Sequence, residues 1–166
     1  MNKRYLSVLV DNHAGVLARV SSLFCQRGFN IDSLTVSATN DPTVSRITIA
    51  CQGDETTYDQ ILKQTRKLVE TQAILSLDSS VSLLRELLLL KVACDEPTRG
   101  ALRDVAAIYK AKIIDLSPGS MVMELTGEPD KIDNFIKLIA ADHEILEMCR
   151  TGVTALERGP VRYKLD

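Results

Sequence analysis

The hydrophobic positions at the start of this chain change from a strand period to a helical period and back. Residues 5–10 are almost continuously apolar and β-prone, which is typical of a central strand. After a polar turn at 11–15, the apolar positions recur on one helical face. They are Val16, Val20, Leu23 and Phe24. Gly28 stands where a helix C-terminus favours a left-handed residue, and residues 31–37 predict a second strand with a bulge.

Three more elements follow before residue 82. Alternation of apolar residues over 47–51 predicts a third strand, and residues 73–81 predict a fourth. Between them, apolar positions again share one helical face. They are Ile61, Leu62, Thr65, Leu68 and Val69. The order is therefore strand, helix, strand, strand, helix, strand.

The second half of the chain repeats this order. Its predicted strands are 87–94, 112–116, 121–126 and 145–153, with helical faces at Leu102, Val105, Ile108 and Tyr109 and at Ile132, Phe135, Ile136 and Ile139. Asp95 can cap the first of these helices, and Pro129 fits the first position of the second. The pattern predicts an α+β fold of two tandem ferredoxin-like βαββαβ units, with domains at 1–82 and 83–166.

The size of each unit predicts self-association. Units of about 80 residues have marginal cores. Helices cover one face of each sheet, yet strand 5–10 has few polar positions on either face. We therefore expect a homodimer, formed by sheet-to-sheet or edge-to-edge contact.

Composition and charge narrow the function. Net charge is -2 with 25% charged residues, which argues against a nucleic-acid partner.

The longest apolar run, 87–90, is too short to span a membrane, and the N-terminus has no signal-peptide pattern, so we expect a cytoplasmic protein. The four cysteines lack zinc spacing and are expected to be buried, reduced thiols; His13 and His143 have no ligand-spaced partner.

Candidate catalytic groups are isolated along the sequence. Ser21-Ser22 lies within a predicted helix, and the acidic pairs at 54–55 and 95–96 suit helix starts. No nucleophile–base pair or phosphate-binding glycine motif is present. His13, alone in a turn, is most simply an exposed polar residue. We therefore expect no catalysis by this chain alone.

The turn at residues 12–15 is the strongest candidate for binding. It joins a buried strand to a helix start, where backbone N–H groups can hold a carboxylate and the helix dipole favours negative charge. Gly15 permits close approach, because it has no Cβ. Asn and Gly are also common in ordinary turns, so spacing alone leaves both interpretations open.

The residues around this turn carry a family likeness. Residues 7–20 resemble the strand–loop–helix signature of ACT domains, and 24–36 continue it in a form similar to the acetolactate synthase small subunit family. Further matching stretches are 41–46, 112–115, 150–153 and 158–159. The resemblance covers almost the whole chain in order. The ACT loop is shared by many regulators, whereas the stretch 26–36 is specific.

The resemblance implies a regulatory site for an amino acid. In this family ACT domains pair, and effector sites lie between two of them. The effector is usually valine, with leucine or isoleucine expected to bind more weakly because one methylene is worth only about 1–3 kcal/mol. By matching position, the loop from Asn12 to Gly15 would meet the polar ends of the effector, with His13 and Ala14 at positions that vary across the family. Asn30 and Ile31 would complete the site from the neighbouring protomer, and Val16, Leu17 and Ile31 would supply its apolar wall. The corresponding second-unit turn, 95–100, is acidic and contains Pro97, so we expect that unit to serve assembly or transmission.

The resemblance also implies the partner. The small subunit would associate with a larger catalytic chain, raise its activity and confer feedback inhibition. The catalytic chain would carry thiamine diphosphate, magnesium and FAD, while this chain would hold no cofactor or metal. The alternatives are a free-standing ACT-type regulator of another enzyme and a small enzyme on the same fold. Co-purification with a thiamine-diphosphate enzyme, and assay of the pure chain with pyruvate, would separate them.

Overall fold

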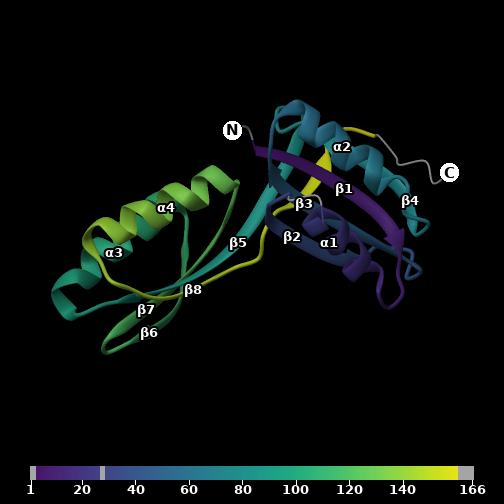
Figure 1. Cartoon of the computed structure of the whole chain (residues 1–166). Coiled ribbons are helices and arrows are strands. Elements are labelled where there is room, and N and C mark those ends of the chain that lie inside the picture. The colour runs from purple at the N-terminus through teal and green to yellow at the C-terminus, as the bar shows by residue number, and fades with distance from the viewer. Residues whose placement is uncertain (1–2, 27–28, 161–166) are drawn as a thin grey trace. The chain divides into compact units, whose positions relative to one another are not determined.

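The computed structural model of this chain describes residues 3–26 and 29–160, and Figure 1 shows its helices and strands. The first six elements are β1 (Lys3–Asp11), α1 (Val16–Gln26), β2 (Ile31–Ala38), β3 (Val44–Gln52), α2 (Glu55–Thr65) and β4 (Thr71–Leu77). Their strands form one antiparallel sheet in the order β2-β3-β1-β4. The predicted bulge near the start of β2 is confirmed, because its register with β3 shifts between Ile31 and Ser33.

The second set of elements repeats this topology. It comprises β5 (Ser82–Ala93), α3 (Glu96–Tyr109), β6 (Lys112–Ser117), β7 (Ser120–Gly127), α4 (Pro129–Asp142) and β8 (Ile145–Arg150). The strand order is β6-β7-β5-β8, again antiparallel. Asp95 caps α3, where it exchanges bonds with Thr98, and Pro129 is the first residue of α4. The predicted α+β fold of two tandem ferredoxin-like units is therefore confirmed.

Each sheet buries one face under its own pair of helices. In the first unit, alternate β1 and β3 residues meet α1 and α2 through Val20, Phe24 and Ile61. In the second unit, Leu88, Leu90 and Val92 of β5 play the same part against helix residues that include Leu102 and Phe135. In each unit, alternate strand residues and one apolar face of each helix therefore pack together, which gives two separate cores.

The chain returns to the first unit at its end. Residues 1–83 and the described part of 153–166 form one compact unit, and residues 84–152 form the other. The predicted division into 1–82 and 83–166 placed residues 153–166 with the second unit instead. β8 ends at Arg150, Gly152 adopts φ 82°, and a short strand, β9 (Thr154–Glu157), follows. The Arg158 N–H donates to the Val81 carbonyl at 3.2 Å, which fixes this segment in the first unit.

This returning segment covers the sheet face opposite α1 and α2. Arg46 lies on that face, because it pairs with Leu9 rather than with a core position of β1. Its Nη1 donates to the Ala155 carbonyl at 3.3 Å, and Ser33 Oγ accepts from the Val153 N–H at 3.0 Å. Val153 and Ala155 are each 2% exposed. The second face of β1 is therefore covered, at least in part, by the chain's own C-terminal segment.

Several local predictions were wrong. Val69, placed on a helical face, is 93% exposed because α2 ends at Thr65, and Ile108 of α3 is 77% exposed. Cys25 and Cys149 are exposed rather than buried, while Cys51 and Cys94 are buried as predicted. The prediction for Gly28 lies outside the described residues.

Candidate effector site

The loop between β1 and α1 is anchored by backbone contacts with two neighbouring segments. The Asn12 N–H donates to the Thr43 carbonyl at 2.7 Å, and the Asp11 N–H donates to the Glu70 carbonyl at 3.0 Å. Gln72 Nε2 adds a bond of 2.6 Å to Asp11 Oδ1. Three connections, β1–α1, β2–β3 and α2–β4, therefore meet at one end of the sheet, and the exposed loop residues 12–15 lie there.

Asn12 is oriented by a side-chain bond of its own. Its Nδ2 donates to the Pro42 carbonyl at 2.8 Å. This leaves the carbonyl oxygen, Oδ1, as the side-chain atom that can accept a hydrogen bond from an ammonium group. His13 Nδ1 lies 3.1 Å from the Ala14 carbonyl, so the His13 ring is engaged within the loop itself.

The backbone conformation just before α1 favours glycine at position 15. Its φ is +91°, a conformation that L-residues rarely adopt, and a Cβ built there would meet no atom within 4 Å. The position is thus strained for a side chain but open to solvent. The space beside Gly15 can admit a ligand without displacing protein atoms.

The start of α1 differs from the starts of α2 and α3. Asp54 and Asp95 cap those two helices, because each accepts a bond from the N–H three residues on, at 2.7 and 3.0 Å. These bonds lower the pKa of both carboxyl groups. Gly15 has no side chain that could do the same at α1. In α1 the N–H groups of Leu17 and Ala18 have no acceptor within the helix, because their partners four residues earlier are outside it.

The apolar candidates occupy different environments. Val16 is 3% exposed and packs in the first core, so only its backbone can face the loop's solvent side. Leu17 is 42% exposed. Leu17 is therefore the apolar side chain that this end of α1 offers to a ligand.

Asn30 and Ile31 lie at the opposite end of the same sheet. Ile31 pairs with Cys51, which pairs with Arg4, whereas the loop follows Asp11. Arg4 and Asp11 are seven positions apart along the strand, or roughly 23 Å. Within one protomer, these two residues cannot join the loop in one site. Asn30 Nδ2 instead contacts Asp32 Oδ1 at 3.2 Å.

An ion pair beside the loop was missed by sequence reasoning. Arg19, one turn into α1, pairs with Glu70, whose side chain is only 9% exposed. The same Glu70 holds Asp11 through its backbone carbonyl. Glu70, in the α2–β4 connection, therefore contacts both the end of β1 and the first turn of α1. The available signal was a single acidic residue directly before a strand, which the prediction of a longer helix obscured.

Residues 3–26 and 29–160 contain neither a metal-ligand cluster nor a membrane-spanning helix. Within these ranges, no three His, Cys, Asp or Glu residues are grouped so that they could hold a metal ion. Over the same described ranges, no helix has the length and hydropathy needed to cross a membrane.

Comparison with known proteins covers both units. The family described as AHAS small subunit-like ACT domain matches residues 6–73, and the family described as small subunit of acetolactate synthase matches 85–159. An acetolactate synthase small subunit from Haemophilus influenzae is 41% identical over 157 residues, which are 95% of this chain and 96% of that protein. A probable acetolactate synthase small subunit from Archaeoglobus fulgidus is 43% identical, covering 95% and 98%. The crystal structure of the Thermotoga maritima acetolactate synthase small subunit matches with a TM-score of 0.86 at 37% identity, covering 97% of this chain and all of that one.

Proposed function

Because the chain belongs to the acetolactate synthase small subunit family, we propose that it binds the large catalytic subunit in the cytoplasm, raises its activity and makes it sensitive to valine. In this proposal thiamine diphosphate, magnesium and FAD belong to the catalytic subunit, and this chain supplies only regulation. The observation that carries the proposal is the open loop at Asn12–Gly15, which leads directly into the start of α1.

The loop's polar groups match the two charged ends of an amino acid. The effector carboxylate would accept from the N–H groups of Leu17 and Ala18, where the helix dipole also favours negative charge. The ammonium group would donate to Asn12 Oδ1, since Asn12 Nδ2 is engaged with Pro42. The branched side chain would lie against Leu17.

A dimer paired through β2 would complete this site. β2 is an edge strand, and its end at Ala38 lies beside Ser45 and hence beside Val10, close to the loop. In antiparallel pairing about a twofold axis, the start of one β2 lies beside the end of the other. Asn30 and Ile31 of a second copy would then be brought to the loop of the first. This supports a homodimer through the ACT units, with two equivalent effector sites.

Such a shared site provides the two states that regulation needs. Valine would stabilise one placement of the paired ACT units over another, and only this difference in affinity can shift the enzyme's activity. Leucine and isoleucine would bind more weakly in the same pocket, because an extra methylene must be accommodated.

The decisive test compares Gly15→Asp with Gly15→Asn in the reconstituted holoenzyme. Both variants carry the same left-handed strain at φ +91°, about 1–2 kcal/mol, which Asn tolerates best among uncharged residues. Only Asp adds a negative charge beside the effector carboxylate. Losing a charge-assisted bond weakens binding by roughly 1.5–3 kcal/mol, or about tenfold to a hundredfold. We expect Gly15→Asp to keep stimulation and to lose most valine inhibition, with Gly15→Asn closer to the wild type.

Acetolactate formation measured against valine concentration reads out both effects. An unchanged valine midpoint in Gly15→Asp would show that the loop is not the effector site. Failure of the wild-type chain to co-purify with, or stimulate, the catalytic subunit would instead favour a free-standing ACT-type regulator.

A further inference from the structure

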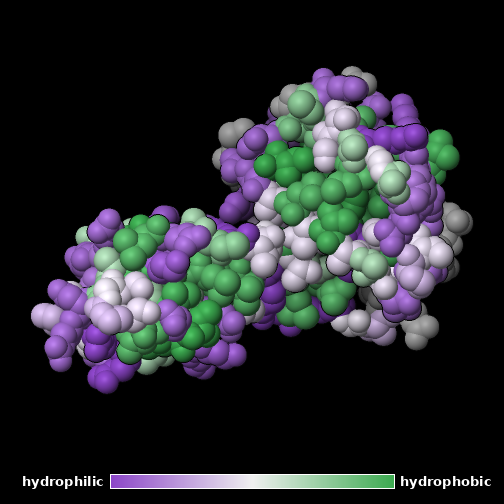
Figure 2. Space-filling view, turned by 90° about the horizontal axis from the view of Figure 1, so that it is seen from below, coloured by the Kyte–Doolittle hydropathy of each residue, from purple (hydrophilic) through white to green (hydrophobic). Residues whose placement is uncertain are grey.

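The second unit exposes an apolar edge strand that the effector site does not use. β6 lies at the edge of its sheet, and residues 112–116 are all exposed. Its apolar side chains, Ile113, Ile114 and Leu116, are 39%, 51% and 51% exposed. In Figure 2, hydrophobic side chains interrupt the hydrophilic surface of the second unit on the side where β6 and β7 lie. A strand edge of this kind is a template for pairing with another strand.

The two charges of β6 lie on one face because of a bulge. Lys112 pairs with Glu124 and Asp115 pairs with Val122, two positions apart on β7 and therefore on the same side of the sheet. Lys112 and Asp115 are three positions apart in sequence, which in a regular strand would place them on opposite faces. The register shift between Ile113 and Asp115 brings them to the same face.

This pattern is complementary to itself. When two copies of β6 run antiparallel about a twofold axis, Lys112 of each can face Asp115 of the other. The same register places Ile113 of each copy beside Ile114 of the other. Two opposite-charge pairs then flank two apolar pairs, the combination that stabilises neighbouring strands.

We propose that β6 is a second self-association surface, whose occupant is β6 of another copy of this chain. α3, which contacts β6, extends the apolar surface with Ile108. Lys112 lies 3.5 Å from Glu124 Oε1 of its own chain, but its side chain is 78% exposed, so its ammonium group can also reach a carboxylate of a second copy. On the opposite edge, β8, Glu147 pairs more closely with Lys91 of its own chain, at 2.7 Å. The β6 surface belongs to the second unit, so this inference is independent of the effector site proposed above.

Two single charge reversals in the full-length chain test the pairing. Lys112→Glu gives a strand with two negative charges, and Asp115→Lys gives one with two positive charges. Each variant alone should self-associate about tenfold or more weakly, because both cross-strand pairs become repulsive. An equimolar mixture should recover the wild-type assembly, because the two variants attract each other. Sedimentation equilibrium at low and high salt measures all three samples.

A matched control separates this effect from general charge change. Glu147→Lys makes the same charge reversal on the other edge of the sheet and should leave self-association unaltered. Recovery on mixing also shows that both single variants are folded. The proposal is overturned if either single variant associates like the wild type, or if the mixture behaves as the average of its two components. Valine binding by calorimetry should persist in every variant, because β6 belongs to the second unit and the effector loop to the first. Loss of valine binding in a β6 variant would contradict this independence.

Discussion

The four cysteines differ in their surroundings, and this changes their chemistry. Cys51 is buried in the first core, and burial, with a smaller effect from the Asp32 carboxylate, raises the pKa of its thiol to about 11. Cys94 is also buried, while Cys25 and Cys149 are exposed. Because the thiolate is the reactive form, the buried pair should be inert in the folded protein.

Titration with a thiol reagent at about pH 8 should therefore show two classes. We expect Cys25 and Cys149 to react rapidly in the native chain, and Cys51 and Cys94 to react only when denaturant is added. Mass spectrometry of the labelled peptides identifies the sites. Rapid native labelling of Cys51 would contradict the first core as described.

Single residues were predictable where one residue type is required. Gly15 was identified from the turn pattern, and its positive φ agrees with that choice. Glu70 could not be identified in the same way, because its role depends on Arg19, which is 51 positions away. An acidic residue directly before a strand marks the position of Glu70, but nothing near it in the sequence points to Arg19 as its partner.

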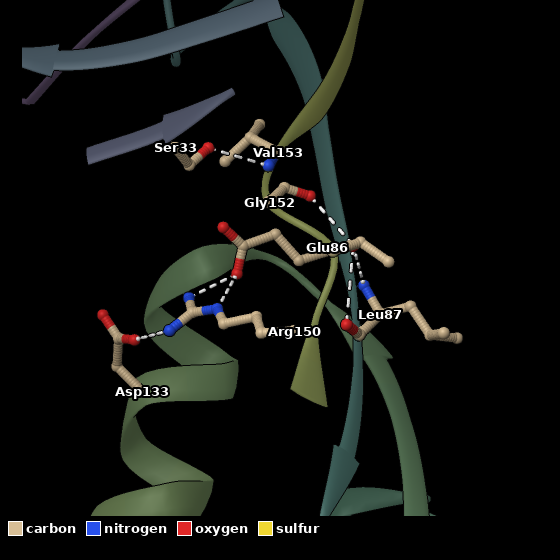
Figure 3. A network of polar contacts seen from close by, with 8 residues as sticks. Ser33, Glu86, Leu87, Asp133, Arg150, Gly152 and Val153 are labelled. Atoms are coloured by element: carbon tan, nitrogen blue, oxygen red, sulfur yellow. Dashed lines mark hydrogen bonds and ion pairs between the residues drawn. The ribbon is translucent and has the colours of Figure 1, made fainter. Parts of the chain in front are cut away.

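At the scale of elements, β5 and β8 are joined at one end by a partly buried charge network (Figure 3). Arg150 of β8 donates to Glu86 of β5 and, at 2.7 Å, to Asp133 of α4. The Glu86 side chain is 4% exposed and that of Arg150 is 26% exposed. One guanidinium thus connects two strands and a helix of the second unit.

Arg150→Met should destabilise this unit by about 3 kcal/mol, because it leaves the Glu86 carboxylate buried without its partner. The double change Arg150→Met with Glu86→Leu removes the buried charge as well and should recover part of that loss. Urea unfolding followed by circular dichroism gives both values. Equal losses in the single and double variants would mean that Glu86 does not depend on Arg150.

The hydrophobic period predicted which segments form helices or strands, but it did not predict the residues at which they end. The apolar residues Leu68 and Val69 continue the helical period beyond Thr65, where α2 ends. There the Thr71 hydroxyl donates to the Thr65 carbonyl at 2.9 Å, and Leu68 still packs at the edge of the core. Tertiary contacts overrode the local pattern, so Val69 lies outside α2 and is exposed instead of packing on its apolar face.

At the scale of the whole molecule, sequence order and spatial division disagree in one segment. Two repeated patterns in series predicted two consecutive domains, and the elements up to β8 follow the predicted order, whereas β9 was not predicted. The placement of residues after Gly152 depends on contacts with Ser33 and Arg46, more than 100 positions earlier. Periodicity carries no information about such distant partners.

Ala155→Asp tests this assignment. It places a charge at a site that is 2% exposed, which should cost about 3 kcal/mol. Hydrogen exchange should accelerate in β1 and β3 and stay unchanged in α3 and α4. Leu156→Asp, at the next residue, is the matched control, because Leu156 is 56% exposed and should tolerate the charge. Faster exchange confined to α3 and α4 would place the segment with the second unit.

The returning segment also sets an order of events during protein synthesis. The first unit begins at the N-terminus, but the strand that covers its second face is translated only after all of residues 84–152. A nascent chain that has just left the ribosome up to β4 therefore presents Tyr5 and Leu9 to solvent, although both are buried in the finished protein. The second unit, whose residues are continuous, can close first. The N-terminal unit is thus the last to be completed, and during translation its uncovered sheet is the surface that a chaperone would meet.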